Sequence, residues 1–233
     1  MRDNVIKSLW IGGSLSPMEQ VSIRSFLRRG HEFHLYTYGI VYDVPEGVVV
    51  KSAEEVLPLS LRHYKDFPQL ALFADFFRYK LLLEKGGWWS DTDAVCVKPF
   101  DFEEDYVFSS EVLQKGGTHI NNGTIKAPAG CPILQRCWDS CLAMNPRSIP
   151  WGASGPALVR AAVGNFKLER FVQSPNVFCP VPWWEVRKFV TPGVLEIPEE
   201  ARTVHLWNSS WGWEQLNKNT FVPGSPYERF RDA

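Results

Sequence analysis

The sequence predicts an α/β fold in a single domain, and three observations support this prediction. The chain of 233 residues is long enough for one domain with a sizeable core. Its composition, with 45% hydrophobic and 22% charged residues, is typical of a globular protein. Strand-like and helix-like segments alternate from the N-terminus onward, which is the pattern of α/β proteins.

The first two elements are a buried strand and a helix. Residues 5–11 form an apolar run that ends at two glycines. Ser16 is a suitable N-cap, Pro17 occupies the first helical position, and Glu19 completes a capping box. Apolar residues then recur at helical spacing as far as Gly30, so we expect the helix to end there.

The later elements follow from hydrophobic periodicity and from capping signals. In chain order they are strands over 32–38 and 48–51, a short helix after the capping box 52–55, a long helix over 67–85, strand-like residues over 88–97 around a carboxylate pair, short strands over 106–109 and 123–126, helices over 132–142 and 155–163, and a strand near 203–207. The C-terminal third is rich in Pro and Trp and poorly periodic, so we expect mainly loops there.

Charge and apolar content exclude some classes of protein. The net charge is −1 and no basic run occurs, which argues against a nucleic-acid partner. No segment approaches the roughly 20 apolar residues of a transmembrane helix, and residues 1–15 lack the apolar core of a signal peptide. The five cysteines form no C-x-x-C pair, which favours free thiols. These features predict a cytoplasmic enzyme, in a bacterium or a virus-infected cell.

Asp91 and Asp93 are the main candidates for chemistry. They follow a strand-like run two residues apart, so an extended backbone would point both side chains to one side. A hard divalent cation would relieve their repulsion, and it could neutralise a departing diphosphate. The pair is therefore consistent with transfer from a nucleotide-sugar, although a bare pair is more typical of a solvated turn with two surface acids.

Asp75 and Arg78 add a second polar feature. They lie three residues apart in an otherwise apolar helix and therefore share one side of it. Charges in such a helix are costly unless they are paired or bound to a ligand. Two interpretations stay open: an ion pair that anchors the helix, or a pair directed at a polar ligand beside the metal.

These residues together resemble a known signature. The run Asp75-Phe-Phe-Arg78-Tyr79, six residues, Gly86-Gly87-Trp-Trp-Ser-Asp91-Thr-Asp93 is similar to that of the DXD-motif sugar transferases. This family includes initiating mannosyltransferases, α1,4-glycosyltransferases and the glucosylating domain of clostridial toxins. The segments 9–13 and 205–211 also look like its first strand and its late His/Ser/Trp segment.

The resemblance implies a GT-A fold, a Rossmann-like mixed sheet flanked by helices. It implies one domain over 1–233, with a nucleotide-binding half at about 1–100 and an acceptor-side half with a C-terminal closing segment at 101–233. The implied activity is retaining transfer of a hexose from a UDP- or GDP-sugar to a glycan or protein acceptor, in surface polysaccharide or glycoprotein glycan synthesis. Front-face attack within a tight ion pair would need no enzyme nucleophile.

The resemblance also implies the site. Asp91, Asp93 and His205 would hold Mn²⁺ or Mg²⁺, and Asp75 and Arg78 would bind hydroxyls of the transferred sugar. The implied donor-binding residues are Trp10, Ile11, Gly12, Asp75, Arg78, Asp91, Thr92, Asn122, His205, Ser210 and Trp211.

Each residue of this implied site has a role of its own. Trp10 would stack on the base, while Ser210 and Trp211 would steady the diphosphate. Either Asn121 or Asn122 would line the sugar pocket. Trp10 and Trp211 could instead be core residues, and His205 a structural one.

Two other functions remain as alternatives. Asp91 and Asp93 also fit the nucleophile motif of a haloacid-dehalogenase-like phosphatase, but no Asp-Asp or Gly-Asp-x-x-x-Asp motif for magnesium occurs after residue 93. A non-catalytic sugar-binding module would use the many aromatic residues for stacking. We interpret four further tryptophans as packing residues: Trp88, Trp89, Trp183 and Trp184.

Overall fold

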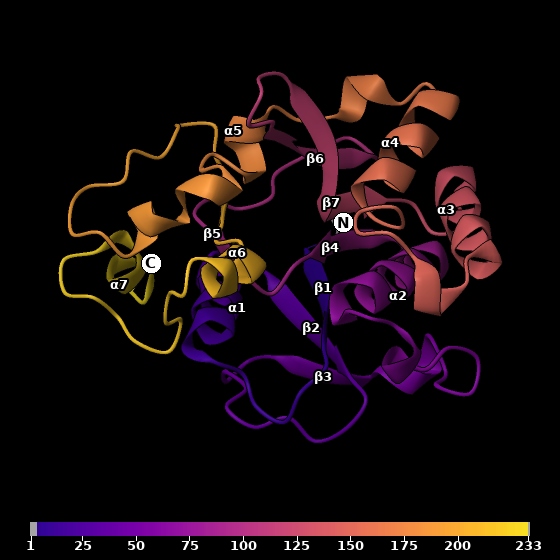
Figure 1. Ribbon diagram of the computed structural model, residues 1–233, viewed down its shortest axis with the longest axis horizontal. Helices are drawn as coiled ribbons and strands as arrows, with labels where there is room; N and C mark the ends of the chain where they lie inside the picture. Colours follow the sequence, from indigo (N-terminus) through magenta and orange to yellow (C-terminus); the bar gives the residue numbers. More distant parts are fainter. Residues whose placement is uncertain (1–3, 233) are drawn as a thin grey trace.

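A computed structural model describes residues 4–232 (Figure 1). Its centre is a six-stranded sheet in the order β3-β2-β1-β4-β7-β6. The strands are β1 (Val5–Trp10), β2 (Glu32–Thr37), β3 (Val49–Ser52), β4 (Gly87–Ser90), β6 (Val107–Val112) and β7 (Thr118–Ala127). Strand β1 pairs in parallel with β2 and β4, and β3 pairs in parallel with β2. Strand β7 runs antiparallel to both of its neighbours, so the sheet is mixed.

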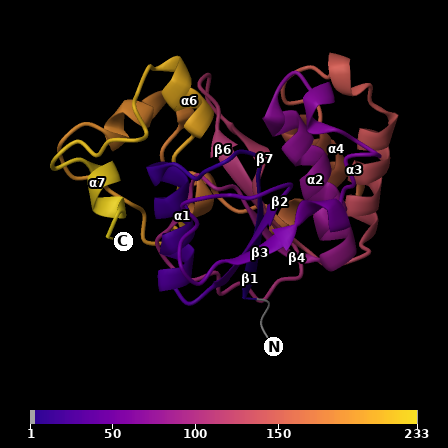
Figure 2. The same ribbon diagram turned by 90° about the horizontal axis from the view of Figure 1, so that it is seen from below.

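Helices cover both faces of this sheet. Helix α1 (Pro17–Arg28) lies on one face, and α2 (Leu70–Lys85), α3 (Pro132–Ala143) and α4 (Pro156–Asn165) lie together on the other (Figure 2). Adjacent residues of β4 divide between the two cores, because Trp88 packs with the α1 side and Trp89 with the α2 side. Both indole rings are only 1% exposed, which confirms their prediction as packing residues.

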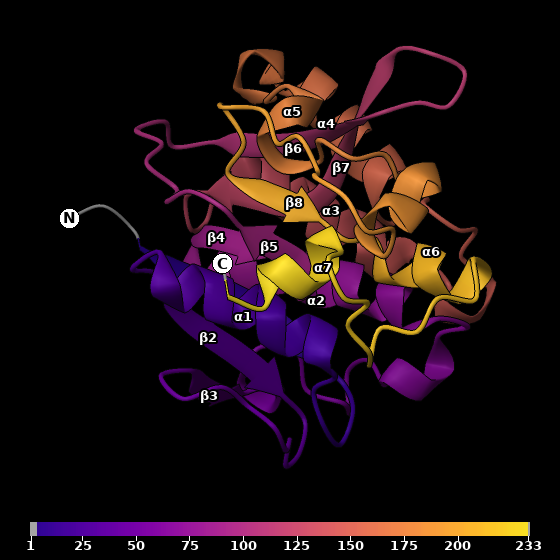
Figure 3. The same cartoon turned by 90° about the vertical axis from the view of Figure 1, so that its left-hand side faces the viewer.

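A two-stranded ribbon lies outside the main sheet. Strand β5 (Ala94–Cys96) pairs antiparallel with β8 (Thr203–His205), and Ala94 stands opposite His205. The ribbon and the C-terminal segment pack beside α1 (Figure 3). The two strands predicted on either side of the carboxylate pair within 88–97 are therefore confirmed, and they belong to different sheets.

Local signals fix several of these boundaries. The Glu19 carboxylate accepts hydrogen bonds from the N–H and hydroxyl of Ser16, so the predicted capping box forms. Gly86 ends α2 at φ +63°, and a Cβ atom there would lie 2.5 Å from the backbone nitrogen of Ala129. Glycine is therefore required at this position, where the chain turns directly into β4.

The C-terminal third is more ordered than predicted. Besides β8 and the expected α4 it contains five short helical segments: the 3-10 helix η4 (Glu169–Phe171), α5 (Pro175–Phe178), the 3-10 helix η5 (Trp183–Phe189), α6 (Asn208–Trp213) and α7 (Pro226–Phe230). The longest has seven residues, so none shows a readable period. Strands β6 and β7 are also longer than the expected 106–109 and 123–126.

Other predictions concern single side chains and the membrane. All five cysteines are free and buried, as predicted. Trp183 is 36% exposed, so its prediction as a packing residue is wrong. No helix within residues 4–232 combines the length and apolarity that crossing a bilayer requires.

Candidate metal and donor site

The carboxylate pair lies in the turn between β4 and β5. An extended backbone was predicted there, but the chain forms a turn instead. The carbonyl of Asp91 accepts a hydrogen bond from the N–H of Ala94 at 3.3 Å. The Asp91 N–H donates to the carbonyl of Gly123 on β7 at 2.9 Å, which holds the turn against the main sheet. The turn brings the two carboxylates together, and the alternation of side chains along a strand does not contribute to their proximity.

Asp91 is oriented by two donors. Its Oδ1 accepts a hydrogen bond from Arg78 Nη2 at 2.7 Å and another from Trp89 Nε1 at 2.8 Å. Trp89 thus acts on the site as well as in the core, a role that the sequence interpretation missed. Its position two residues before Asp91 was the available signal, because strand residues at this spacing share a face.

Asp93 is held by the C-terminal segment. Its Oδ1 lies 3.1 Å from His205 Nε2, and its Oδ2 accepts the backbone N–H of Asn208 at 2.8 Å. The β5–β8 pairing explains this proximity, since the two strands carry Asp93 and His205 to one end of the ribbon. Asn208 contributes only its backbone, so no side-chain signal could have identified it.

Three predicted metal ligands come together in this way. One ligand atom each from Asp91, Asp93 and His205 lies within 4.8 Å of the others. Two carboxylate oxygens and one imidazole nitrogen suit Mn²⁺ or Mg²⁺. Gly123 keeps the space beside them open, because a Cβ atom there would lie 3.2 Å from both Asp91 Oδ2 and His205 Cε1. The donor set therefore fits the predicted cation.

The electrostatics of the triad also suit a cation. Burial raises the pKa of Asp91, and the charge of Asp93 raises it too, against the opposing effect of Arg78. Burial would also raise the pKa of Asp93, but His205 and the Asn208 N–H hold it below its usual value. Burial would lower the pKa of His205, yet the Asp93 carboxylate raises it well above its ordinary range. A divalent ion would replace the imidazole proton as the positive charge of this cluster.

Asp75 and Arg78 form a buried polar network beside the triad. Arg78 Nη1 lies 3.5 Å from Asp75 Oδ1 and also donates to the carbonyl of Asn122. The Asp75 carboxylate accepts from Asn122 Nδ2 at 2.6 Å and from Ser154 Oγ at 2.8 Å. Burial raises the pKa of Asp75, against the charge of Arg78. The ion pair predicted as a helix anchor is therefore present, and it directly contacts Asp91.

The two candidate asparagines on β7 point to different sides. Asn122 belongs to the Asp75 network, whereas the amide of Asn121 contacts Ser109 Oγ and donates to Cys179 Sγ at 3.2 Å. The Cys179 thiol in turn lies 3.8 Å from His205 Nδ1. Nothing in the sequence pattern pointed to Cys179, because its contact with His205 exists only in the folded chain.

Trp10 and its neighbours lie at the carboxyl end of β1. The Trp10 ring is partly buried, and Lys218 Nζ lies 5.9 Å from its centroid. Ile11 packs against the core on the α2 side, and a Cβ atom on Gly12 would lie 3.0 Å from Trp10 Nε1. Thr92 occupies the middle of the carboxylate turn. All four therefore lie where α/β proteins bind ligands, at the carboxyl ends of parallel strands.

The last two predicted donor residues are buried in α6. Trp211 lies in the core between Phe189 and Tyr227, and its indole N–H donates to the carbonyl of Leu206 at 2.7 Å. Ser210 is also buried, and its backbone N–H bonds the carbonyl of Trp207. Trp211 thus occupies the core position that the sequence left open, and it supports the helix that contacts Asp93.

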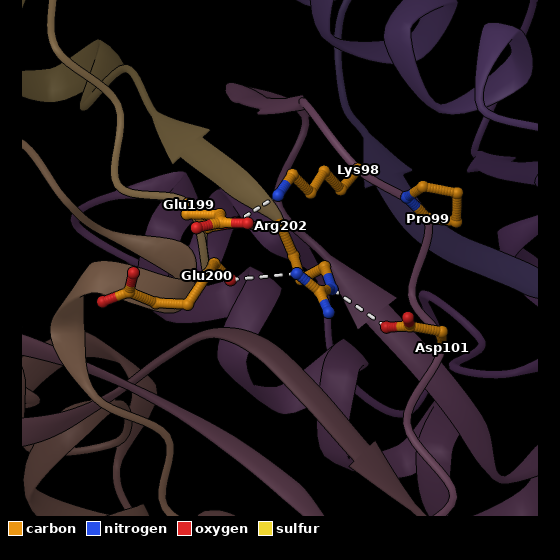
Figure 4. Close-up of a pocket in the computed structure, with 6 residues that line it drawn as sticks. All are labelled: Lys98, Pro99, Asp101, Glu199, Glu200 and Arg202. Carbon is orange, nitrogen blue, oxygen red and sulfur yellow. Dashed lines mark hydrogen bonds and ion pairs between the residues drawn. The ribbon is translucent and has the colours of Figure 1, made fainter.

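Two hollows lie near these elements. A pocket of about 540 Å³ lies beyond the far end of β5, where Arg202 and Lys98 pair with Asp101 and with the carbonyls of Glu199 and Glu200 (Figure 4). Both of its cations already have hydrogen-bond partners, and β5 separates it from the triad. A second pocket of about 300 Å³, lined by residues including Thr37 and Tyr38, lies at the carboxyl ends of β2 and β3. Thr37 pairs with Trp10, so the second pocket adjoins the predicted base-stacking residue.

Comparison with known proteins identifies this region. Residues 36–111 match the family described as "Glycosyltransferase sugar-binding region containing DXD motif". The initiation-specific alpha-1,6-mannosyltransferase of Candida albicans is 31% identical over 78 residues, which are 34% of this chain and 20% of that protein. The chain thus matches about a fifth of the length of this relative.

Comparison with solved structures concerns the fold. A structure described as PaToxG Glycosyltransferase aligns with 99% of this chain and 86% of its own, with a TM-score of 0.52 and 14% identity. The predicted GT-A fold and the predicted resemblance to DXD-motif sugar transferases are both confirmed.

Proposed function

Because residues 36–111 carry a DXD-containing glycosyltransferase region, we propose that the chain transfers a hexose from a UDP- or GDP-sugar to a glycan or protein acceptor. The observation that carries this proposal is the convergence of Asp91, Asp93 and His205 beside the buried Arg78. Residues 1–100 would form the nucleotide-binding half, and 101–233 the acceptor side. The product would belong to a surface polysaccharide or a glycoprotein glycan.

Asp91, Asp93 and His205 would hold Mn²⁺ or Mg²⁺ at the turn before β5. Such an ion supplies Lewis-acid stabilisation of the negative charge on a departing diphosphate. Asp93 and His205 are already fixed by Asn208 and by the β5–β8 ribbon, so little rearrangement would be required of them.

The neighbouring residues would bind the rest of the donor. The base would stack on Trp10 beside the second pocket, whose Thr37 is the strand partner of Trp10. Buried Nε1 of Trp10 and Nε of Arg78 have no hydrogen-bond partner within residues 4–232. Buried donors without partners are costly, so a polar ligand that reached either atom would supply a missing hydrogen bond. Asp75 and Arg78 would then orient hydroxyls of the transferred sugar.

Transfer would retain the anomeric configuration, as the family resemblance implies, by front-face attack of the acceptor within a tight ion pair. This route requires no enzyme nucleophile. It also agrees with the state of Asp91, whose Oδ1 accepts two hydrogen bonds and whose other oxygen faces Gly123. A phosphatase of the haloacid-dehalogenase type would instead need that carboxylate free to attack a phosphate.

A panel of UDP- and GDP-sugars, incubated with Mn²⁺ and analysed by mass spectrometry, tests this function. A transferase should hydrolyse one donor slowly without acceptor and should glycosylate some members of an acceptor panel. Isothermal titration of the free nucleotides with and without Mn²⁺ provides a second readout. A binding module would show neither metal-dependent nucleotide affinity nor donor hydrolysis, and that result would contradict the proposal.

A further inference from the structure

Two of the exposed tryptophans lie together, outside the metal triad. Trp213 is 63% exposed and Trp183 is 36% exposed. Their ring centroids lie 6.0 Å apart at an interplanar angle of 86°, and Trp184 meets Trp183 edge-on at 5.4 Å. Exposed indole rings forgo a large burial energy, so such a cluster indicates a face that binds something.

Trp213 is tied to the metal triad through α6. The helix begins at Asn208, whose backbone N–H donates to Asp93 Oδ2 at 2.8 Å, and it ends at Trp213. At about 1.5 Å of rise per residue, the Trp213 backbone lies roughly 8 Å along the helix axis from Asn208. The backbone that carries the exposed ring is therefore within the reach of one or two sugar residues from Asp93.

Trp183 is tied to the same triad by a different route. The Trp207 ring stacks on His205 with centroids 4.0 Å apart, and its Nε1 donates to the carbonyl of Val181 at 2.7 Å. Val181 precedes Trp183 by two residues, and η5 packs against α6 (Figure 1). The two exposed rings therefore belong to one rigid group that also holds Asp93 and His205.

Charged side chains lie close to the two tryptophans in the sequence. Arg187 Nε lies 2.7 Å from Glu214 Oε2, directly beside Trp213, and Lys188 pairs with Glu185. A saccharide offers both kinds of surface that match this face: C–H faces that stack on an aromatic ring, and hydroxyls that bond to charged side chains. A purely apolar partner would leave these polar groups unmatched.

We propose that Trp183 and Trp213 form an acceptor subsite, on which a sugar ring of a saccharide acceptor stacks next to the metal triad. The inference rests on the proposed function and names the chemical class of its acceptor. It places the acceptor on the C-terminal side of the site, opposite the Asp75 network that would hold the transferred sugar.

The test compares transfer with hydrolysis. The Trp213→Ala variant is assayed with the donor that the wild type turns over and with a panel of hexose-containing trisaccharides as acceptors. The ratio of transfer to hydrolysis should fall about tenfold or more, because only transfer needs the acceptor to be bound. Trp213→Tyr should restore much of this ratio. Phe166→Ala removes an exposed ring at the C-terminal end of α4 and should leave the ratio unchanged.

A binding measurement separates the subsite from the chemistry. Protein labelled with 5-fluorotryptophan is titrated with the same trisaccharides, and the Trp213 ¹⁹F resonance is assigned from its loss in Trp213→Tyr. A shift of that resonance supports the subsite even if no donor is turned over. Absence of donor turnover would contradict only the proposed function. An unmoved resonance together with an unchanged transfer ratio overturns the subsite. So does a changed sedimentation coefficient of Trp213→Ala with normal transfer, which would show that the rings join copies of the chain.

Discussion

Arg78 Nη2 lies 2.7 Å from Asp91 Oδ1, so a side chain of helix α2 directly fixes the first acid of the DXD motif. The two residues are thirteen positions apart, and the residues between them include the end of α2, the turn at Gly86 and all of β4. The signature Asp75…Arg78…Asp91 is thus one contact network, which brings the sugar-binding pair of the proposal next to its metal ligands.

Removal of the charge of Asp93 should abolish metal binding. In Asp93→Asn the carboxylate that contacts both His205 and the Asn208 N–H becomes a neutral amide. We expect Mn²⁺ affinity, measured by electron paramagnetic resonance, and donor hydrolysis each to fall by about a hundredfold or more. Asp101→Asn, in the pocket beyond β5, is the matched control and should retain both. Retained Mn²⁺ affinity in Asp93→Asn would remove this residue from the metal site.

Substitution of Arg78 should separate its two roles. Arg78→Ala leaves the buried Asp75 and the partly buried Asp91 without their cation, so we expect a loss of about 3 kcal/mol in the free energy of unfolding. Arg78→Lys keeps the charge but not the planar set of donors, and it should fold. In Arg78→Lys we expect an approximately tenfold rise in donor KM with little change in affinity for the free nucleotide. A normal donor KM in this variant would favour a purely anchoring role.

The space at Gly123 should be required for the metal. A Cβ atom would lie 3.2 Å from Asp91 Oδ2 and from His205 Cε1, so Gly123→Ala should weaken Mn²⁺ binding by roughly tenfold or more. Gly212→Ala places the same methyl group in open space and serves as control. Circular dichroism should show both variants folded. Equal Mn²⁺ affinity in the two would mean that the cation lies elsewhere.

Stability should fall as the pH is lowered through the titration of His31. Burial lowers the pKa of His31, against a smaller effect of its hydrogen bond to the Asn4 carbonyl, and Nε2 accepts the N–H of Phe100 at 3.0 Å. The unfolded chain therefore takes up the proton first, so the contribution of neutral His31 is complete above pH 6.5 and is lost below it.

Urea unfolding at pH 5.5 and 7.5 measures this effect. The wild type should lose stability at the lower pH, and His31→Gln, which cannot gain a proton, should lose less. His63→Gln replaces a histidine whose Nδ1 accepts an exposed hydrogen bond from the Lys65 N–H, and it should behave as the wild type. An identical pH dependence for wild type and His31→Gln would show that other groups dominate.

The sequence by itself determined what depends on neighbouring residues. Strand alternation, the Ser16–Glu19 capping box and the glycine after α2 located the elements of the first hundred residues. Two residues that are three positions apart always share one face of a helix, so the pairing of Asp75 with Arg78 was predictable from their spacing. His205 was predicted as a metal ligand from the family resemblance, because no periodic pattern pointed to it.

Tertiary structure decided how these parts meet. Asp93 and His205 are 112 residues apart and become neighbours only because β5 pairs with β8. Asn208 acts through its backbone, Cys179 through a contact across the core, and Trp183 lies exposed although its sequence context is apolar. Such contacts depend on which surfaces the completed sheet and helices bury, and this cannot be predicted from the local sequence.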